Sequence, residues 1–359
     1  MTRWNMENKI IEIHKKLTIV DGLSAVYPNE FNKEYIKNVK KGGITAIHVT
    51  IPDIECFSLE KAVDELSYWF QRLRALEPYN VKLVTTVKGI RDAKENGGVA
   101  IILGSQGVGF IGLDLKRLEF LARLGMKTMQ PTYQQRNQFG DGCGEKTDVG
   151  LSNLGIQWVK EMNKLNMLIS LSHAGYKTSM DVIDISEDPV IFDHSNPKAL
   201  CNHPRNITDE QIKACTEKGG LIGLCPLAMF VNTEKDPTEL DIGDFINHID
   251  HVVELVGVDY VSIGTDLAEE HFQTPEQILE GRRMFPALGY KGSRNVEDEF
   301  LKSGRKRLYF YEKHMPWMSS TSEMSIFTEA LINRGYSPQE TGKILGENLL
   351  RVYEKVWGS

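Results

Sequence analysis

The sequence predicts an α/β protein built as a closed (β/α)8 barrel. Short β-branched, apolar segments alternate with amphipathic segments of helical period along the whole chain, and no linker or low-complexity segment divides it. Nearly continuous apolar segments are typical of parallel strands, which are buried on both faces. Repeated βα units place helices outside a parallel sheet. The 359 residues are enough for one such domain over 1–359.

Nine segments are predicted strands, one more than a closed eight-stranded barrel requires. They are Leu17–Leu23, Ile44–Ile51, Val81–Val87, Val99–Ser105, Lys127–Tyr133, Met167–His173, Val190–Ser195, Leu221–Pro226 and Tyr260–Asp266. We expect Val81–Val87 to be peripheral, because only a short helix separates it from Val99. An open doubly wound sheet is the alternative, but no GxGxxG turn follows an early strand.

Predicted helices separate these strands. They include Leu115–Leu124, Gly155–Leu165, Asp209–Lys218 and Phe245–Val256. Ser152 and Thr208 are typical N-cap residues. Gly125, Gly219 and Gly257 mark the C-terminal ends of three helices.

The C-terminal quarter of the chain departs from this alternation. The region 269–319 is irregular and charged, and we expect it to be an insertion after the last strand, as a lid or an oligomer contact. Two helices, Met324–Arg334 and Pro338–Trp357, are expected to close one end of the barrel.

Composition excludes several classes of function. The net charge is −7 with both signs mixed, and no basic run indicates binding to nucleic acid or to a membrane surface. No apolar run reaches the roughly 20 residues of a membrane span, and the segment 1–16 lacks the apolar core of a signal peptide. Five cysteines without a CxxC pair favour a reducing compartment, so we expect a cytoplasmic protein. Homo-oligomerisation is left open.

Polar side chains at the ends of predicted strands indicate a site. His173 and His194 end consecutive strands, and Asp266 ends the last strand, which adjoins the first in a closed barrel. In such barrels the chemistry gathers at the C-terminal ends of the strands. Imidazole and carboxylate groups suit Zn²⁺, so two histidines and an aspartate on one rim form a metal-site pattern, with structural roles for the histidines as an equal alternative.

Other polar residues have competing interpretations. Arg205 is either a surface residue paired with Asp209 or a guanidinium that binds a carboxylate. His48 is expected in the core or the lumen of the barrel, and His271 is a candidate for an extra ligand. The pair His248 and His251 is expected on a solvated or packing face of a helix, and Cys143 on a mobile Gly-rich loop.

The order of motifs along the chain resembles the membrane (renal) dipeptidase family of zinc peptidases. The motifs are Gly150-Leu-Ser-Asn-Leu-Gly, Ser170-Leu-Ser-His173, Pro189-Val-Ile-Phe-Asp-His194, His203-Pro-Arg205-Asn, Gly264-Thr-Asp266 and Ile344-Leu-Gly-Glu-Asn348. The likeness spans nearly the whole chain. It implies a metallo-dependent hydrolase barrel in which two zinc ions activate water against the amide bond of a dipeptide.

The resemblance also assigns roles to individual residues. It implies that His173 and His194 bind the second metal ion and that Asp266 transfers a proton to the leaving amine. It implies further that Arg205 binds the free carboxylate of the substrate. Asn137, together with Gln106, completes the predicted substrate-binding residues.

The chain departs from the family at several of its ligands. The His-x-Asp pair that holds the first metal ion corresponds to Leu23 and Ala25, which cannot coordinate. The bridging glutamate corresponds to Gln106, a neutral amide that does not offset two dications. A histidine that stabilises the oxyanion corresponds to Tyr133, whose hydroxyl can still donate a hydrogen bond. The pattern indicates a divergent branch with one zinc ion or none.

Three functions remain open from sequence. The first is a metal-dependent hydrolase, probed by metal content, that cleaves a dipeptide or a similar small amide with a free carboxylate. The second is a metal-free homologue that binds or transforms a small carboxylate metabolite, which chelator-resistant binding would reveal. The third is a structural or regulatory protein, against which the polar rim of His173, His194, Asp266 and Arg205 argues.

Overall fold

The computed structural model describes residues 3–52, 56–235, 239–268, 272–273, 308–309 and 317–358. Its strands are β1 (Ile19–Ser24), β2 (Ile44–Thr50), β3 (Val81–Leu83), β4 (Val99–Ser105), β5 (Met126–Met129), β6 (Leu168–Ile169), β7 (Ile191–Phe192), β8 (Leu221–Leu224), β9 (Val261–Ile263), β10 (Phe272–Gln273) and β11 (Leu308–Tyr309). Its helices are α1 (Arg3–Lys16), α2 (Lys33–Lys41), α3 (Leu59–Leu76), α4 (Val87–Glu95), α5 (Lys116–Arg123), α6 (Asn153–Lys164), α7 (Tyr176–Ile185), α8 (Asp209–Glu217), α9 (Ala228–Val231), α10 (Ile242–Val256), α13 (Ser325–Arg334), α14 (Pro338–Gly342) and α15 (Asn348–Trp357).

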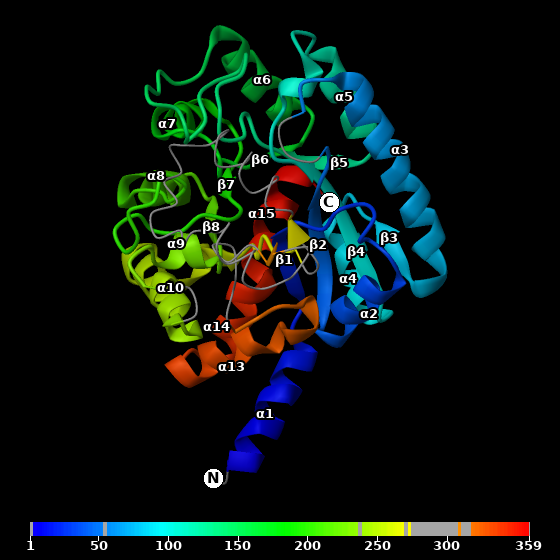
Figure 1. Ribbon diagram of the computed structural model, residues 1–359, viewed down its shortest axis with the longest axis vertical. Helices are drawn as coiled ribbons and strands as arrows, with labels where there is room; N and C mark the ends of the chain where they lie inside the picture. The colour runs from blue at the N-terminus through cyan, green and yellow to red at the C-terminus, as the bar shows by residue number, and fades with distance from the viewer. Residues whose placement is uncertain are drawn as a thin grey trace.

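The strands form a parallel barrel surrounded by helices, as predicted. The sheet runs β1-β2-β4-β5-β6, and a second sheet runs β7-β8-β9. A parallel bridge between Ser170 and Ile191 joins the two sheets. The barrel closes where the N–H of Asp266 donates to the carbonyl of Leu23 at 2.9 Å. In Figure 1, α2 to α5 flank one side of the barrel and α7 to α10 flank the other.

Strand β3 is peripheral, as its sequence predicts. It pairs only with the start of β4, from Val81 against Val99 to Leu83 against Ile101, and lies off the path of the sheet. Strand β5 pairs with β4 only further along, from Leu103 onward. The eight remaining parallel strands therefore make up the barrel.

The predicted strands extend beyond the observed ladders in the second half of the barrel. The segment predicted over Met167–His173 is paired only over Leu168–Ile169, and that over Val190–Ser195 only over Ile191–Phe192. Single backbone hydrogen bonds continue the contact, such as the 2.7 Å bond from the N–H of Ser195 to the carbonyl of Gly223. The site residues therefore lie on short segments just beyond the ladders.

Helix ends follow the predicted signals. Ser152 accepts a hydrogen bond from the N–H of Gly155, and Thr208 forms a capping box with Gln211. Gly125, Gly219 and Gly257 follow α5, α8 and α10 with φ of 94°, 82° and 98°, a conformation that glycine adopts without steric cost. The predicted helix Pro338–Trp357 is interrupted by a π-helical segment, Lys343–Glu347, between α14 and α15.

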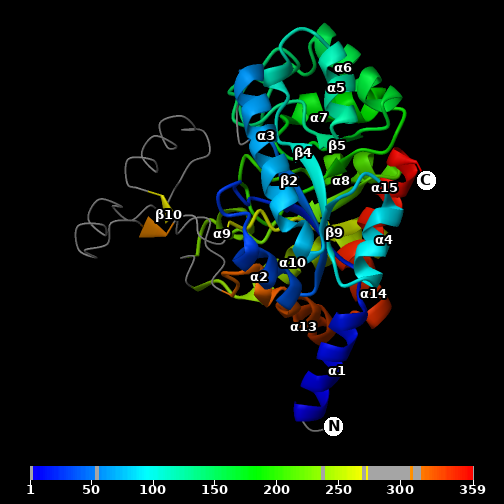
Figure 2. The same ribbon diagram turned by 90° about the vertical axis from the view of Figure 1, so that its right-hand side faces the viewer.

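Helix α15 packs against the N-terminal end of the barrel. Its apolar side chains form one buried cluster with residues near the start of β1, β2, β6, β7 and β8. The cluster includes Val20, Ala46, Leu168, Ile191, Leu221, Leu349, Leu350, Val352, Tyr353 and Val356. Figures 1 and 2 show α1 beside α13, extending away from the barrel with the N-terminus at its tip. Polar groups of the lumen are thus confined to the C-terminal half of the barrel.

The predicted insertion over 269–319 lies mostly outside the described residues, and His271 lies outside them entirely. Within that region the structure describes an antiparallel pair, β10 with β11. Among the described helices, none combines the length and the apolar character needed to cross a membrane.

The seam between β1 and β9 depends on Asp21. Its carboxylate is fully buried and accepts hydrogen bonds from the N–H of Thr265 at 2.8 Å and from the Thr265 hydroxyl at 2.7 Å. We expect Asp21→Ala to lower the free energy of unfolding by about 2–4 kcal/mol, because two buried donors lose their acceptor. Thr265→Val removes one donor and should cost about 1 kcal/mol. Urea denaturation measures the free energy of unfolding of both variants. Equal losses would contradict the assignment of two hydrogen bonds to the Asp21 carboxylate.

The same carboxyl predicts a pH dependence of stability. Burial raises the pKa of Asp21 to about 7, although the bonds from Thr265 act in the opposite direction. In the unfolded chain an aspartate titrates near about 3.9. Between these values only the folded state holds the proton. Protonated Asp21 therefore makes its whole contribution to the free energy of unfolding below about pH 4, and this contribution is lost as the pH rises to about 7. We expect Asp21→Asn to abolish this decrease in the free energy of unfolding, as measured by urea denaturation at pH 4.5 and 7. An unchanged decrease between the two pH values would contradict the prediction.

Candidate functional site

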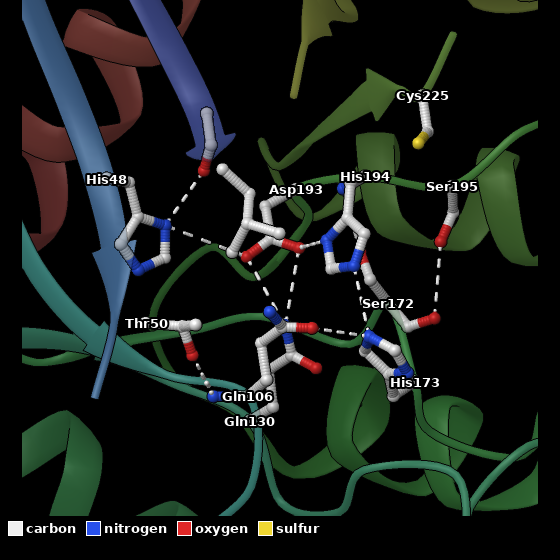
Figure 3. A network of polar contacts seen from close by, with 12 residues as sticks. His48, Thr50, Gln106, Gln130, Ser172, His173, Asp193, His194, Ser195 and Cys225 are labelled. Carbon is white, nitrogen blue, oxygen red and sulfur yellow. Dashed lines mark hydrogen bonds and ion pairs between the residues drawn. The ribbon is translucent and has the colours of Figure 1, made fainter. Parts of the chain in front are cut away.

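A buried carboxylate orients the first of the two predicted histidine ligands. Asp193 follows β7 directly, has no exposed surface, and contacts His194 Nδ1 through Oδ1 at 2.6 Å. The backbone N–H of His194 donates to Ser172 Oγ at 2.9 Å. With Nδ1 donating to Asp193, the Nε2 atom of His194 points toward His173, as Figure 3 shows.

Asp193 is the centre of a polar network in the lumen. Gln130 Nε2 donates to both carboxylate oxygens, at 3.4 and 3.5 Å. His48 Nδ1 donates to the carbonyl of Gly22 at 2.8 Å and lies 3.9 Å from Asp193 Oδ2 (Figure 3). Burial alone would raise the pKa of Asp193, but His194 holds it well below its usual range. Burial lowers the pKa of His48. Asp193 is therefore a carboxylate beside a neutral His48.

The second predicted ligand, His173, faces the first. The two Nε2 atoms of His173 and His194 lie 3.0 Å apart. His173 Nε2 also lies 2.6 Å from Gln106 Oε1 (Figure 3). The Tyr133 ring stacks on the His173 ring, with centroids 4.0 Å apart and planes inclined by 25°. The structure thus brings together four of the predicted site residues.

Arg205 lies beneath this group and is almost fully buried, with 2% of its surface exposed. Nη1 donates to the Ser172 carbonyl and to Ser195 Oγ, and Nη2 donates to the His194 carbonyl at 3.0 Å. Its interpretation as a surface residue paired with Asp209 is wrong, because the polypeptide folds its loop back over the barrel. Asp209 instead contacts His251 Nε2 at 2.9 Å.

One side-chain N–H group of Arg205 is left without a bond to the described residues. Its Nε is buried and has no hydrogen-bond partner among the residues that the structure describes. Its Nη2 also lies 3.4 Å from His173 Nε2. The positive charge of Arg205 therefore lies next to the two imidazoles, with one N–H left for a ligand.

Asp266 reaches the same rim from β9. It adopts φ of 48°, is half-buried, and is fixed by its own backbone N–H to the carbonyl of Leu23. Within the described part of the chain, no hydrogen bond engages its carboxylate. The default role of a helix N-cap does not apply, since Leu267 and Ala268 continue without helical structure. Asp266 is thus a carboxylate available on the rim.

Asn137 shapes the loop on which it lies. Its amide nitrogen donates to the carbonyl of Pro131 at 2.8 Å, and its amide oxygen accepts from the N–H of Phe139 at 2.8 Å. Both ends of the side chain are therefore engaged by backbone. The role that this geometry supports is to hold the loop that follows Tyr133, rather than to contact a substrate directly.

The two histidines of α10 have partners of their own. His248 is buried on α10 and contacts the carbonyl of Val231 through Nε2 at 2.9 Å, so it belongs to a packing face as expected. Leu23 is fully buried and Ala25 is half-buried at the end of β1. No donor atom replaces the family's first pair of ligands at these positions.

Sequence reasoning missed Asp193, Gln130 and Ser172. Asp193 carries a recognisable signal, since a charged residue inside an apolar strand is rarely buried unless it is paired. Its neighbour His194 was singled out while Asp193 was passed over. Gln130 and Ser172 carry no such signal, because their role depends on contacts with residues 63 and 22 positions away.

Atoms of the kinds that bind zinc lie close together at this point. Nε2 of His173 lies 3.0 Å from Nε2 of His194 and 2.6 Å from Oε1 of Gln106. Nitrogen ligands about 2.0–2.1 Å from a tetrahedral zinc ion lie about 3.3 Å apart, close to the observed 3.0 Å. Among the described residues, no cluster of three His, Cys, Asp or Glu side chains completes a site. The two histidines and Gln106 are therefore the residues that would hold a metal ion here.

The fold and the site define a metallohydrolase-like (β/α)8 barrel. The model of the membrane dipeptidase family, peptidase family M19, matches residues 28–299. The chain belongs to this family. The metallopeptidase character of the family agrees with the histidine pair, while the metal content of this chain is a separate question.

Curated relatives share part of their length with the chain. A dipeptidase of Claviceps purpurea (strain 20.1), tcpJ, is 24% identical over 288 residues, which are 80% of this chain and 58% of the relative. An uncharacterized dipeptidase of Schizosaccharomyces pombe is 31% identical over 177 residues, 48% of this chain and 42% of the relative. The chain thus spans about half of the length of these relatives.

Solved structures match over almost the full chain. An amidohydrolase from Pseudomonas aeruginosa has a TM-score of 0.80 at 30% identity and covers 98% of this chain and 99% of its own. A metallo peptidase from Rhodobacter sphaeroides, liganded with a phosphinate mimic of the dipeptide L-Ala-D-Ala, has a TM-score of 0.74 at 21% identity and covers 95% and 99%. The second likeness shows the fold alone.

Glycines beside Asp193 are needed for its position. A Cβ atom added at Gly223 would lie 2.1 Å from the carbonyl oxygen of Asp193 and 2.6 Å from its carbonyl carbon. We expect Gly223→Ala to displace Asp193 and to lower the free energy of unfolding by about 1–3 kcal/mol. Gly342→Ala, in α14, meets only the flexible Leu17 side chain at 3.2 Å and is the control. Thermal denaturation measures the difference, and equal stability would contradict the prediction.

Proposed function

We propose that the chain is a dipeptidase-like hydrolase that cleaves a dipeptide, or a related small amide with a free carboxylate, with one metal ion rather than two. The convergence of His173 Nε2, His194 Nε2 and Gln106 Oε1 carries this proposal. Family membership supports the reaction class, and the buried Leu23 supports the loss of the first ion.

The protein groups supply positions and protons around such an ion. When bound, the ion supplies Lewis acidity, which makes water nucleophilic at neutral pH. Asp193 fixes the tautomer of His194, so that its Nε2 presents a lone pair. The neutral amide of Gln106 adds a donor oxygen without charge. Arg205, 3.4 Å from His173 Nε2, weakens the affinity for a cation and accounts for a single ion.

We assign substrate recognition and proton transfer to Arg205, Tyr133 and Asp266. The Nε of Arg205 donates to the free carboxylate of the substrate, as charge-assisted bonds favour. The Tyr133 hydroxyl, held beside His173 by ring stacking, donates to the developing oxyanion. Asp266, whose carboxylate is free to move a proton, protonates the leaving amine. Gln106 lies where it contacts both an ion and the amide of a substrate.

Metal content tests the proposal directly. We expect elemental analysis after zinc loading and desalting to find about one ion per chain in the wild type and none in His194→Ala. His251→Ala is the matched control, because His251 lies on α10 and pairs with Asp209. Asp193→Asn should retain the fold and weaken metal binding about 10- to 100-fold, since it disturbs the partner of a ligand. Dipeptide hydrolysis should follow the metal content across the four proteins.

One observation favours a second candidate, a metal-free homologue that binds or transforms a small carboxylate. The guanidinium of Arg205 already supplies a positive charge beside His173, where the family would place an ion. Absence of metal from zinc-loaded wild type, with carboxylate binding that survives chelator, would establish this candidate and sink the first.

A further inference from the structure

A second pocket lies beside the histidine pair. Its volume is about 280 Å³, and it lies against Ala174 and Gly175, which directly follow His173. Arg205 lines it, and so do the first residues of α7 and α8. The pocket lies at the small end of the range of small-molecule sites, large enough for one amino-acid side chain. Arg205 therefore both lines this pocket and contacts His173 of the histidine pair.

Two cations are held side by side at this pocket. The N–H of Lys198 donates to the carbonyl of Ile207 at 2.7 Å, and the N–H of Ile207 donates to the carbonyl of Asn196 at 2.9 Å. These bonds join the segment of Lys198 to the segment of Arg205. The Asn206 amide fixes the same loop to the carbonyls of Cys201 and Phe230, at 2.8 and 2.9 Å. The backbone segments that carry the two cations are therefore held together.

Neither cation has an anionic partner in the described part of the chain. The Lys198 ammonium makes no hydrogen bond or ion pair there, and Arg205 contacts carbonyl and hydroxyl oxygens and the neighbouring imidazole of His173. Burial raises the pKa of the Cys143 thiol to about 11, while the charges of Arg205 and Lys198 act to lower it. Both charges therefore reach the same wall of the pocket, and a buried cation without a counter-ion favours an anionic ligand.

The acidic residues of the pocket are already engaged. Asp148 accepts hydrogen bonds from the N–H groups of Gly150 and Lys177 and from the Thr178 hydroxyl. Glu145 accepts one from the N–H of Arg136 at 2.8 Å. Both carboxylates therefore bond groups of the surrounding loop. Lys198 is a charged side chain at the pocket that has no bonded partner among the described residues.

We propose that this pocket binds an acidic side chain on the substrate residue whose carboxylate contacts Arg205, so that the preferred substrates end in an aspartate-like or glutamate-like residue. The inference rests on the proposed function for the role of Arg205. Lys198 forms a charge-assisted hydrogen bond with the second carboxylate. A neutral amide of the same shape lacks this interaction, and a basic side chain meets repulsion from Lys198.

Binding of half-substrates tests the pocket without a metal ion or turnover. The probes are N-acetylaspartate, N-acetylasparagine and N-acetylalanine, each as the racemate, titrated by calorimetry into chelator-treated protein. We expect N-acetylaspartate to bind about 10- to 100-fold more tightly than N-acetylasparagine, as a hydrogen bond between charged groups implies. Lys198→Met should remove this difference. Lys213→Met, an exposed lysine on α8 outside the pocket, should retain it.

The outcomes separate this inference from the proposed function. Equal binding of the aspartate and asparagine probes, or an unchanged difference in Lys198→Met, would overturn the acidic pocket and leave the dipeptidase proposal intact. Metal-dependent hydrolysis of neutral dipeptides alone would do the same. Lys198→Gln with circular dichroism guards against misfolding, since a folded variant that keeps the selectivity also overturns the inference.

Discussion

The carboxylate of Asp193 lies inside the barrel with no exposed surface, and a charge in that position has to be matched from every side. His194 and Gln130 supply the hydrogen bonds, and His48 faces it in neutral form. The strands that pass closest to its backbone carry glycine, because a Cβ at Gly223 would overlap it. The lumen is thus arranged around one anion.

This arrangement explains why the departures from the family pattern occur together. Two dications need several carboxylates to balance them, whereas beside the two histidines the described residues place the carboxylate of Asp193 and the cation of Arg205. An apolar Leu23 and a neutral Gln106 are consistent with that balance, since neither adds charge. This balance is the electrostatic ground for the proposal of one ion rather than two.

The fold was predictable from sequence because its signals are local. Continuous apolar strands, N-caps such as Ser152 and Thr208, and glycines such as Gly125 each report on a few neighbouring residues. The site was only partly predictable. Strand ends pointed to His173 and His194, but the burial of Arg205 depends on contacts with carbonyls 33 and 11 residues away. Such contacts exist only once the barrel has closed.

The packing of α15 against the base of the barrel has a consequence for biosynthesis. Segments from both ends of the sequence must meet to complete the structure, as His14 and Thr328 do across 314 residues. The apolar lower layer, with Val20 and Leu221, stays uncovered until α15 has left the ribosome. During that interval the nascent barrel exposes apolar surface of the kind that makes folding intermediates prone to aggregation.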